Sequence, residues 1–169
     1  WGKFLNAGQT CVAPDYVLVH KDIKNQFLEA MKEQVNLIHD GEPKNKETYV
    51  RIINKRHFDR LNELIHKDKI YCGGEIDEKH LYISPTILDN ISFDDKVMED
   101  EIFGPILPVI EFDNLDEIIS KVKTRPNPLA LYVFTKKRKI KEKLIREISF
   151  GGGSVNDTVL HLANSKLPF

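Results

Sequence analysis

The sequence has little of what marks several protein classes. It contains only two cysteines, Cys11 and Cys72, too few for a disulfide framework and without the paired spacing of a zinc site. Nine glycines and eight prolines are too few for a collagen-like or low-complexity chain. No stretch approaches the roughly 20 consecutive apolar residues that a membrane span needs. We therefore expect a globular protein of a reducing compartment, with a cytoplasmic location.

An excess of charge of one sign is also missing. The 169 residues include 25 lysines and arginines against 26 aspartates and glutamates, a net charge of −1. Such a chain has no overall attraction to nucleic acid or to an anionic membrane, so we expect neither as a partner. The basic run 136–139, which continues with Lys141 and Lys143, is more typical of a solvated helix face than of a phosphate-binding surface. The six histidines fall singly, without the spacing of a helical metal site, and we expect no metal.

Four segments show helical periodicity. Apolar residues recur every three or four positions at 23–38, 49–64, 115–122 and 140–148. Asp22 is the expected N-cap of the first segment. Asn114 and Glu117 have the spacing of a capping box at the start of the third.

Short β-favouring runs separate these segments. They lie at 16–19, 82–88, 106–110 and 129–134. Pro85 predicts an edge or a bend in the second, while the last is an apolar run typical of a strand covered on both faces. Alternation of strands and helices predicts an α/β fold with a mostly parallel sheet and flanking helices. We expect a single domain over residues 1–169.

Cys11 is the first candidate for chemistry. Among the side chains present, a thiol is the strongest nucleophile near neutral pH without assistance. Cys11 follows a run of small and polar residues at 6–10, which suits a sulfur presented on a tight loop before a strand. Its own backbone N–H could then face the oxygen of an attacked carbonyl. Local composition alone nevertheless favours a buried, inert thiol, as most free cysteines are, and the same interpretation applies to Cys72.

Two further stretches are informative. Residues 99–101 are three consecutive carboxylates before a stiff Phe-Gly-Pro turn, and a carboxylate beside an aromatic ring is a sensible contact for a nucleotide. An acidic surface turn is the alternative. The glycine-rich stretch 151–157 lacks both the lysine of a P-loop and the glycine spacing of a dinucleotide fold, so we interpret it as a close-packed turn before a strand.

Together and in this order, four motifs resemble the aldehyde dehydrogenase superfamily, most closely its class 3 or fatty-aldehyde branch. Gly-Gln-Thr-Cys at 8–11 is similar to the nucleophile loop of that family, and Glu-Ile-Phe-Gly-Pro at 101–105 to its cofactor-side signature. The stretches 127–134 and 152–157 also match in place, so the resemblance extends over essentially the whole chain.

The resemblance implies a covalent mechanism. Cys11 would attack an aldehyde to give a thiohemiacetal, hydride would pass to NAD or NADP, and water would hydrolyse the resulting thioester to a carboxylic acid. It also implies that Glu101 binds the nicotinamide-side ribose and Phe103 packs near that ring, while Asn156 and Phe169 border the substrate tunnel. The parent would be a homodimer or a higher homo-oligomer.

The family's cofactor domain, general-base glutamate and second oxyanion donor precede the nucleophile loop. We therefore expect residues 1–169 to be the catalytic domain of a longer parent, truncated at both ends, with no bound cofactor and no dehydrogenase turnover in isolation. Each missing group would cost about 10²- to 10³-fold. Two alternatives stay open: a cysteine hydrolase that pairs Cys11 with a histidine such as His161, and a non-catalytic α/β interaction domain.

Overall fold

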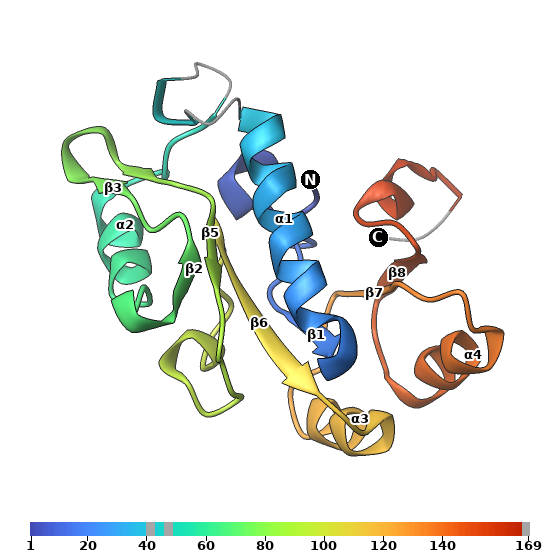
Figure 1. Cartoon of the computed structure of the whole chain (residues 1–169). Helices are drawn as coiled ribbons and strands as arrows, with labels where there is room; N and C mark the ends of the chain where they lie inside the picture. Colours follow the sequence, from blue (N-terminus) through green and yellow to red (C-terminus); the bar gives the residue numbers. More distant parts are fainter. Residues whose placement is uncertain (40–42, 46–48, 167–169) are drawn as a thin grey trace. The chain divides into compact units, whose positions relative to one another are not determined.

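A computed structural model describes residues 1–39, 43–45 and 49–166 (Figure 1). The chain divides into two compact units. One consists of Trp1 and residues 3–112, and the other of Gly2 and residues 113–169. Each is described by itself below.

The first unit is built on a four-stranded sheet. In spatial order its strands are β1 (Val17–His20), β6 (Ile106–Phe112), β5 (Thr86–Leu88) and β2 (Ile70–Cys72). β1 and β5 run parallel to β6, whereas β2 is antiparallel to β5. A small antiparallel pair, β3 (Ile76–Asp77) and β4 (Tyr82–Ile83), adds to this unit. The mostly parallel pairing confirms the predicted α/β class, and Pro85 lies at the break between β4 and β5, as predicted.

Alternate residues of β6 enter two different cores. Leu107 and Val109 pack with Leu28 of helix α1 (Lys24–His39) on one face of the sheet. Ile106 packs with Phe58 of helix α2 (Lys55–Asn62) on the other face. Successive side chains of a strand point to opposite faces, so one continuous apolar run serves both helices.

The start of α1 differs from the prediction. A short 3₁₀ turn, Lys21–Ile23, precedes the helix, and the Nδ1 atom of His20 accepts from Asp22 N at 3.3 Å. The prediction that Asp22 is the N-cap was therefore wrong, because the imidazole of the preceding residue takes the free amide. Within α1, Phe27, Met31 and Val35 face the core as the spacing indicated.

The second helix is also shorter than the segment 49–64 that the periodicity predicted. Asn54 ends the extended stretch before α2, and its side-chain oxygen accepts from His57 N at 2.9 Å. Tyr49 lies outside the helix and donates from its hydroxyl to a backbone carbonyl of β4 at 2.9 Å. Tyr49 is therefore buried by tertiary packing and does not belong to the helix periodicity that predicted it.

The second unit is a strand–helix–strand arrangement with one helix before it. Its elements are α3 (Leu115–Lys123), β7 (Ala130–Val133), α4 (Arg138–Glu147) and β8 (Gly152–Val155), with β7 and β8 parallel. The predicted turn at 151–157 is largely the strand β8. A Cβ on Gly153 would stand 2.1 Å from Leu131 O, so glycine is needed where the two strands approach. The ends of the predicted apolar strand, Leu129 and Phe134, are exposed.

Seven short 3₁₀ turns complete the described parts of the chain. They are Leu5–Gly8, Lys21–Ile23, Pro43–Asn45, Lys67–Lys69, Glu78–His80, Lys96–Met98 and Leu160–Ala163. Among the described residues, no helix is both long enough and apolar enough to cross a membrane.

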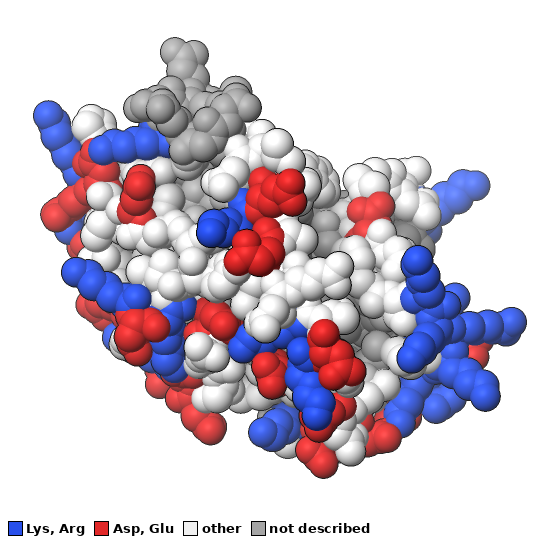
Figure 2. Space-filling model, in the orientation of Figure 1, with Lys and Arg blue, Asp and Glu red and all other residues white. Residues whose placement is uncertain are grey.

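The basic run forms exposed surface, as predicted. Figure 2 shows Lys and Arg gathered over α4, where residues 136–139 are all exposed. Arg138 pairs with Glu142 one turn later at 2.6 Å, and Lys143 pairs with Asp116 of α3. Such exposed pairs contribute only about 0–1 kcal/mol each.

The cap of α3 gives a test of the helix assignment. Asn114 Oδ1 accepts from the backbone N–H of Asp116 at 2.8 Å and of Glu117 at 3.3 Å. We expect Asn114→Ala to lower the free energy of unfolding by about 1 kcal/mol, measured by urea denaturation. Ser120→Ala on the same helix removes only an exposed bond to Asp116 O and should change it by less than about 0.5 kcal/mol. Equal effects of the two substitutions would contradict the assigned cap.

Candidate active site

The loop before Cys11 has an unusual backbone. Three successive residues, Asn6, Ala7 and Gly8, have positive φ values of 52°, 51° and 71°. A left-handed conformation costs about 1–2 kcal/mol for a residue with a Cβ, so the surroundings must hold Asn6 and Ala7 in place. The loop is closed on itself by two bonds: Asn6 Nδ2 donates to Gln9 O at 2.9 Å, and Gln9 N donates to Asn6 O at 3.1 Å.

This loop packs against the Phe-Gly-Pro turn. A Cβ added to Gly8 would lie 2.1 Å from Gly104 O, so the two backbones approach more closely than any other residue type permits. The topology explains the meeting, because the loop precedes β1, the turn precedes β6, and these strands are parallel neighbours. The segments that enter adjacent parallel strands lie at the same edge of a sheet. Two of the motifs identified in the sequence therefore form one site.

Helix α2 fixes the conformation of the turn. Phe103 has a positive φ of 47°, a strained value for an aromatic residue. His57 Nε2 lies 2.8 Å from Phe103 O; a carbonyl can only accept, so this nitrogen carries the proton. Arg60 donates to the preceding carbonyls, to Glu101 O at 3.3 Å and to Ile102 O. Three successive carbonyls of the turn are thus held by two side chains of one helix.

Cys11 itself is exposed at the end of the loop. Within the described residues its backbone N–H donates to no other group, which leaves it available to an incoming oxygen. Local composition favoured a buried thiol at position 11, and that prediction was wrong because Cys11 is exposed. Cys72, by contrast, is half-buried, and burial raises the pKa of its thiol, which keeps it in the unreactive protonated form.

A buried lysine connects the two motifs electrostatically. Only 4% of the Lys3 surface is exposed, and burial lowers the pKa of its ammonium to about 8, against the opposing effect of the carboxylates of Asp15 and Glu101. Asp15, four residues after Cys11, also accepts from Ile102 N at 3.0 Å. The segment on either side of Cys11 is therefore tied to the turn that contains Glu101.

The turn offers suitable groups for part of a nucleotide. The side chain of Glu101 is exposed, and the half-buried ring of Phe103 packs edge-on to His57 with centroids 6.0 Å apart. A carboxylate accepts hydrogen bonds from ribose hydroxyls, and an aromatic ring can cover a flat heterocycle. The side chains of Glu101 and Phe103 therefore fit the nicotinamide-side half of a dinucleotide. In the described ranges, no group of three or more His, Cys, Asp or Glu side chains has the arrangement of a metal site.

The other two predicted site residues belong to the second unit. Asn156 is exposed after β8, with a positive φ of 59°, and its Oδ1 accepts from Thr135 N at 2.9 Å. Its side chain therefore fastens the segment after β7. Phe169 lies outside the described residues. The contacts of Asn156 and Phe169 with substrate remain predictions.

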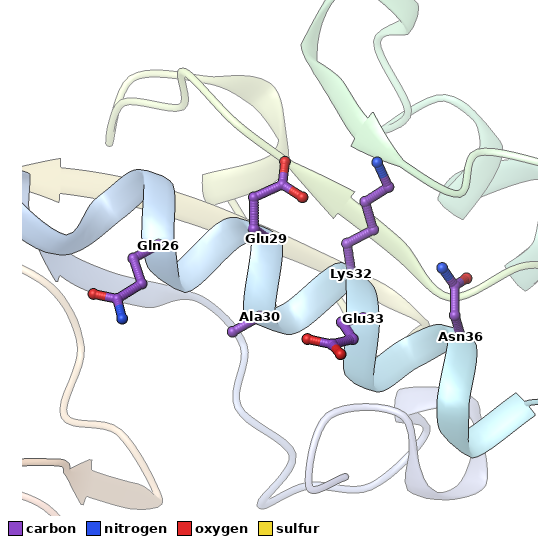
Figure 3. A pocket seen from close by; sticks show the side chains of 6 residues that line it. All are labelled: Gln26, Glu29, Ala30, Lys32, Glu33 and Asn36. Atoms are coloured by element: carbon purple, nitrogen blue, oxygen red, sulfur yellow. The ribbon is translucent and has the colours of Figure 1, made fainter.

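A hollow of about 540 Å³ lies along α1 (Figure 3). Its lining consists of Gln26, Glu29, Ala30, Lys32, Glu33 and Asn36. Glu29 is already engaged by the hydroxyl of Tyr71. Since the lining contains neither a cysteine nor an aromatic ring, this hollow is not the candidate active site.

A comparison with protein families identifies the family of the chain. The model of the aldehyde dehydrogenase family matches residues 1–169, the whole chain. The chain belongs to the aldehyde dehydrogenase family. It is 45% identical over its full length to 4,4'-diaponeurosporen-aldehyde dehydrogenase of Staphylococcus aureus and 46% identical to mouse aldehyde dehydrogenase family 3 member A2. It is also 44% identical to a rat aldehyde dehydrogenase described as dimeric and NADP-preferring.

Solved aldehyde dehydrogenases confirm the fold. The substrate-bound state of Staphylococcus aureus AldH matches 99% of this chain with a TM-score of 0.97 and 45% identity. An NAD-dependent aldehyde dehydrogenase of Sinorhizobium meliloti matches 94% with a TM-score of 0.82 and 25% identity. The chain covers 37% and 33% of those two chains, and 35–37% of the three relatives named above.

Several residues of the candidate site were not predicted. Gln9 was quoted only as part of a motif, and Lys3, Asp15, His57 and Arg60 were given no role. No signal in a single sequence identifies His57 or Arg60, because their partners lie more than 40 positions away. Gln9 and Asp15 lie close to Cys11 in the sequence. The amide of Gln9 and the carboxylate of Asp15 could have been predicted to bond to nearby backbone, as such side chains often do beside a tight loop.

The close approach at Gly8 gives one test. Gly8→Ala and Gly74→Ala both place a Cβ on a residue with positive φ, but the first meets backbone at Gly104 O and the second meets the flexible end of Ile70 at 2.6 Å. We expect both to lose about 1–2 kcal/mol of unfolding free energy from backbone strain, and Gly8→Ala to lose about 1–3 kcal/mol more. Urea denaturation measures both. An equal loss would show that the loop does not rest on the turn.

Burial of Lys3 gives a second test. Its pKa of about 8 in the fold lies below the ordinary lysine value of 10.5, so the unfolded chain binds more protons between these limits and stability rises with pH there. Lys3→Met removes this dependence. We expect the variant to gain most stability over the wild type at and below about pH 8, and the gain to shrink toward pH 10. Denaturant unfolding of both proteins from about pH 7 to about pH 10 measures it, and a gain that grows with pH would contradict the assignment.

Proposed function

We propose that the complete protein oxidises an aldehyde to a carboxylic acid with NAD or NADP, and that Cys11 is the nucleophile. The observation that carries this proposal is the exposed Cys11 at the end of a strained loop whose backbone rests on the turn containing Glu101 and Phe103. The three relatives named above are each named as an aldehyde dehydrogenase, which supports the reaction class.

The residues of this chain act mainly in the first and last steps. The sulfur of Cys11, once deprotonated, forms a bond to the aldehyde carbon, and the carbonyl π electrons move onto oxygen to give a thiohemiacetal. The Cys11 N–H donates to that oxygen and stabilises its charge. NAD or NADP supplies the hydride acceptor when it is bound. Water then attacks the resulting thioester, the carbon–sulfur bond breaks, and the carboxylic acid leaves with Cys11 restored.

The remaining roles are proposed on the same basis. Glu101 accepts from the ribose on the nicotinamide side and Phe103 packs near its ring, while Asn156 and Phe169 border the aldehyde. The groups expected outside this chain, a general base and a second oxyanion donor, complete the chemistry. A homo-oligomeric state, a cytoplasmic location and the inactivity of the isolated 169 residues are part of the same proposal.

The two alternatives are less well supported. A cysteine hydrolase needs a histidine that takes the thiol proton. His161, the histidine named for that role, belongs to the second unit, and in the unit that contains Cys11 the ring nitrogens of His57 are engaged with Phe103 O and Arg60. A buried Cys11 would favour the non-catalytic domain, but Cys11 is exposed.

Replacement of the sulfur tests the proposal. In the complete protein we expect Cys11→Ser to lower kcat for aldehyde oxidation by at least about 10³-fold, because removal of a covalent nucleophile leaves only binding and electrostatic stabilisation. Formation of NADH or NADPH, followed by its absorbance, measures the rate. Cys72→Ser is the matched control and should keep the wild-type kcat. Cys11→Ser with more than a tenth of that rate would refute the proposed nucleophile.

A further inference from the structure

Gln9 lies two residues before Cys11 and links the loop to a distant segment. Its Nε2 donates to Arg51 O at 3.1 Å and to Asn6 O at 3.2 Å. Its Oε1 accepts from Ile53 N at 3.0 Å. Both the amide nitrogen and the amide oxygen of Gln9 are therefore bonded. Two of the three bonds reach residues more than 40 positions further along the chain.

The segment that receives these bonds is itself firmly placed. Ile52 is buried, with 2% of its surface exposed, and its N–H donates to Leu81 O at 2.9 Å. The guanidinium of Arg51 lies 5.0 Å from the ring centroid of the buried Tyr82 and donates to Tyr49 O at 2.9 Å. The side chain of Gln9 thus attaches the loop to a surface segment that is anchored in the core through Ile52.

On the other side, the loop rests on Gly104 O through Gly8. A glycine contact resists approach but supplies no attraction, so it cannot by itself keep the left-handed residues 6–8 from relaxing. We propose that Gln9 is a positioning residue, whose amide holds the Cys11 loop onto residues 51–53 so that the sulfur keeps the orientation that attack on a carbonyl needs. This inference rests on the proposed role of Cys11.

A positioning role predicts a specific pattern of losses. Gln9→Met has a similar shape but makes none of the three bonds. In the complete protein we expect it to lower kcat for aldehyde oxidation by about 10- to 100-fold, since a displacement of about 1 Å can have that effect. Alkylation of Cys11 by iodoacetamide, measured in a Cys72→Ser background, needs no fixed orientation and should stay within about threefold of the unsubstituted rate. The amide of Ile53 should exchange with solvent faster.

Gln9→Glu and Thr86→Val complete the experiment. Gln9→Glu keeps an acceptor for Ile53 N, but it loses both donated bonds and places a carboxylate oxygen against the carbonyls of Arg51 and Asn6, so its kcat should also fall below that of the wild type. Thr86→Val removes two bonds elsewhere in the first unit, from Gly74 N at 3.0 Å and to Ser84 O at 2.8 Å, and should leave kcat unchanged. A wild-type kcat in Gln9→Met would overturn the proposal; if that variant does not fold, a wild-type kcat in Gln9→Glu would overturn it.

The two proposals fail in different ways. Full activity in Cys11→Ser refutes the nucleophile, whatever happens at Gln9. If Cys11→Ser is inactive but Gln9→Met has a normal kcat, only the positioning role is refuted. Faster exchange at Ile53 with a normal kcat likewise refutes it, because the clamp would then exist without affecting the reaction.

Discussion

The contact between Gly8 and the carbonyl of Gly104 is the constraint on which the site depends. Any side chain at position 8 would occupy the place of that oxygen, 2.1 Å from its Cβ. Because the contact joins backbone to backbone, it limits how closely the Cys11 loop and the turn at 101–105 approach each other, while the bonds of Gln9 are proposed to hold the loop at that limit. Cys11, proposed as the nucleophile, and the groups proposed to face the cofactor therefore share one frame.

The sheet provides that frame. β1 and β6 are parallel and directly paired, with Val17 opposite Val109, so the segments that enter them arrive side by side. α2 lies on one face of the same sheet and extends two side chains, His57 and Arg60, to the carbonyls of the turn. Packing of α2 through Phe58 and Leu61 thus also determines where Phe103 lies. Stability and site geometry depend on the same contacts.

Local signals in the sequence predicted the class of the fold and much of its order. Asn114 acts on amides two and three positions away, and Pro85 breaks the strand in which it stands, so both were found from short patterns. Tyr49 misled the helix assignment because its hydroxyl bonds to a strand that lies 34 positions later. The site followed the same division: Cys11, Glu101 and Phe103 belong to recognisable motifs, whereas the partners of Gln9, His57 and Arg60 are set by tertiary packing. The exposure of Cys11 could not be derived from its neighbours, because the loop rests on the turn at 101–105, which lies more than 90 positions away.

The central claim is that the sulfur of Cys11 bonds to the aldehyde carbon during turnover. The most direct measurement mixes the complete protein with a long-chain aldehyde and NAD or NADP, stops the reaction with acid within the first turnover, and determines the mass of the peptide that contains Cys11. The account predicts an acyl group on that peptide, present with cofactor and removed by neutral hydroxylamine as a thioester is. Steady oxidation of the aldehyde with that peptide unmodified, or with the acyl group on another residue, would contradict it.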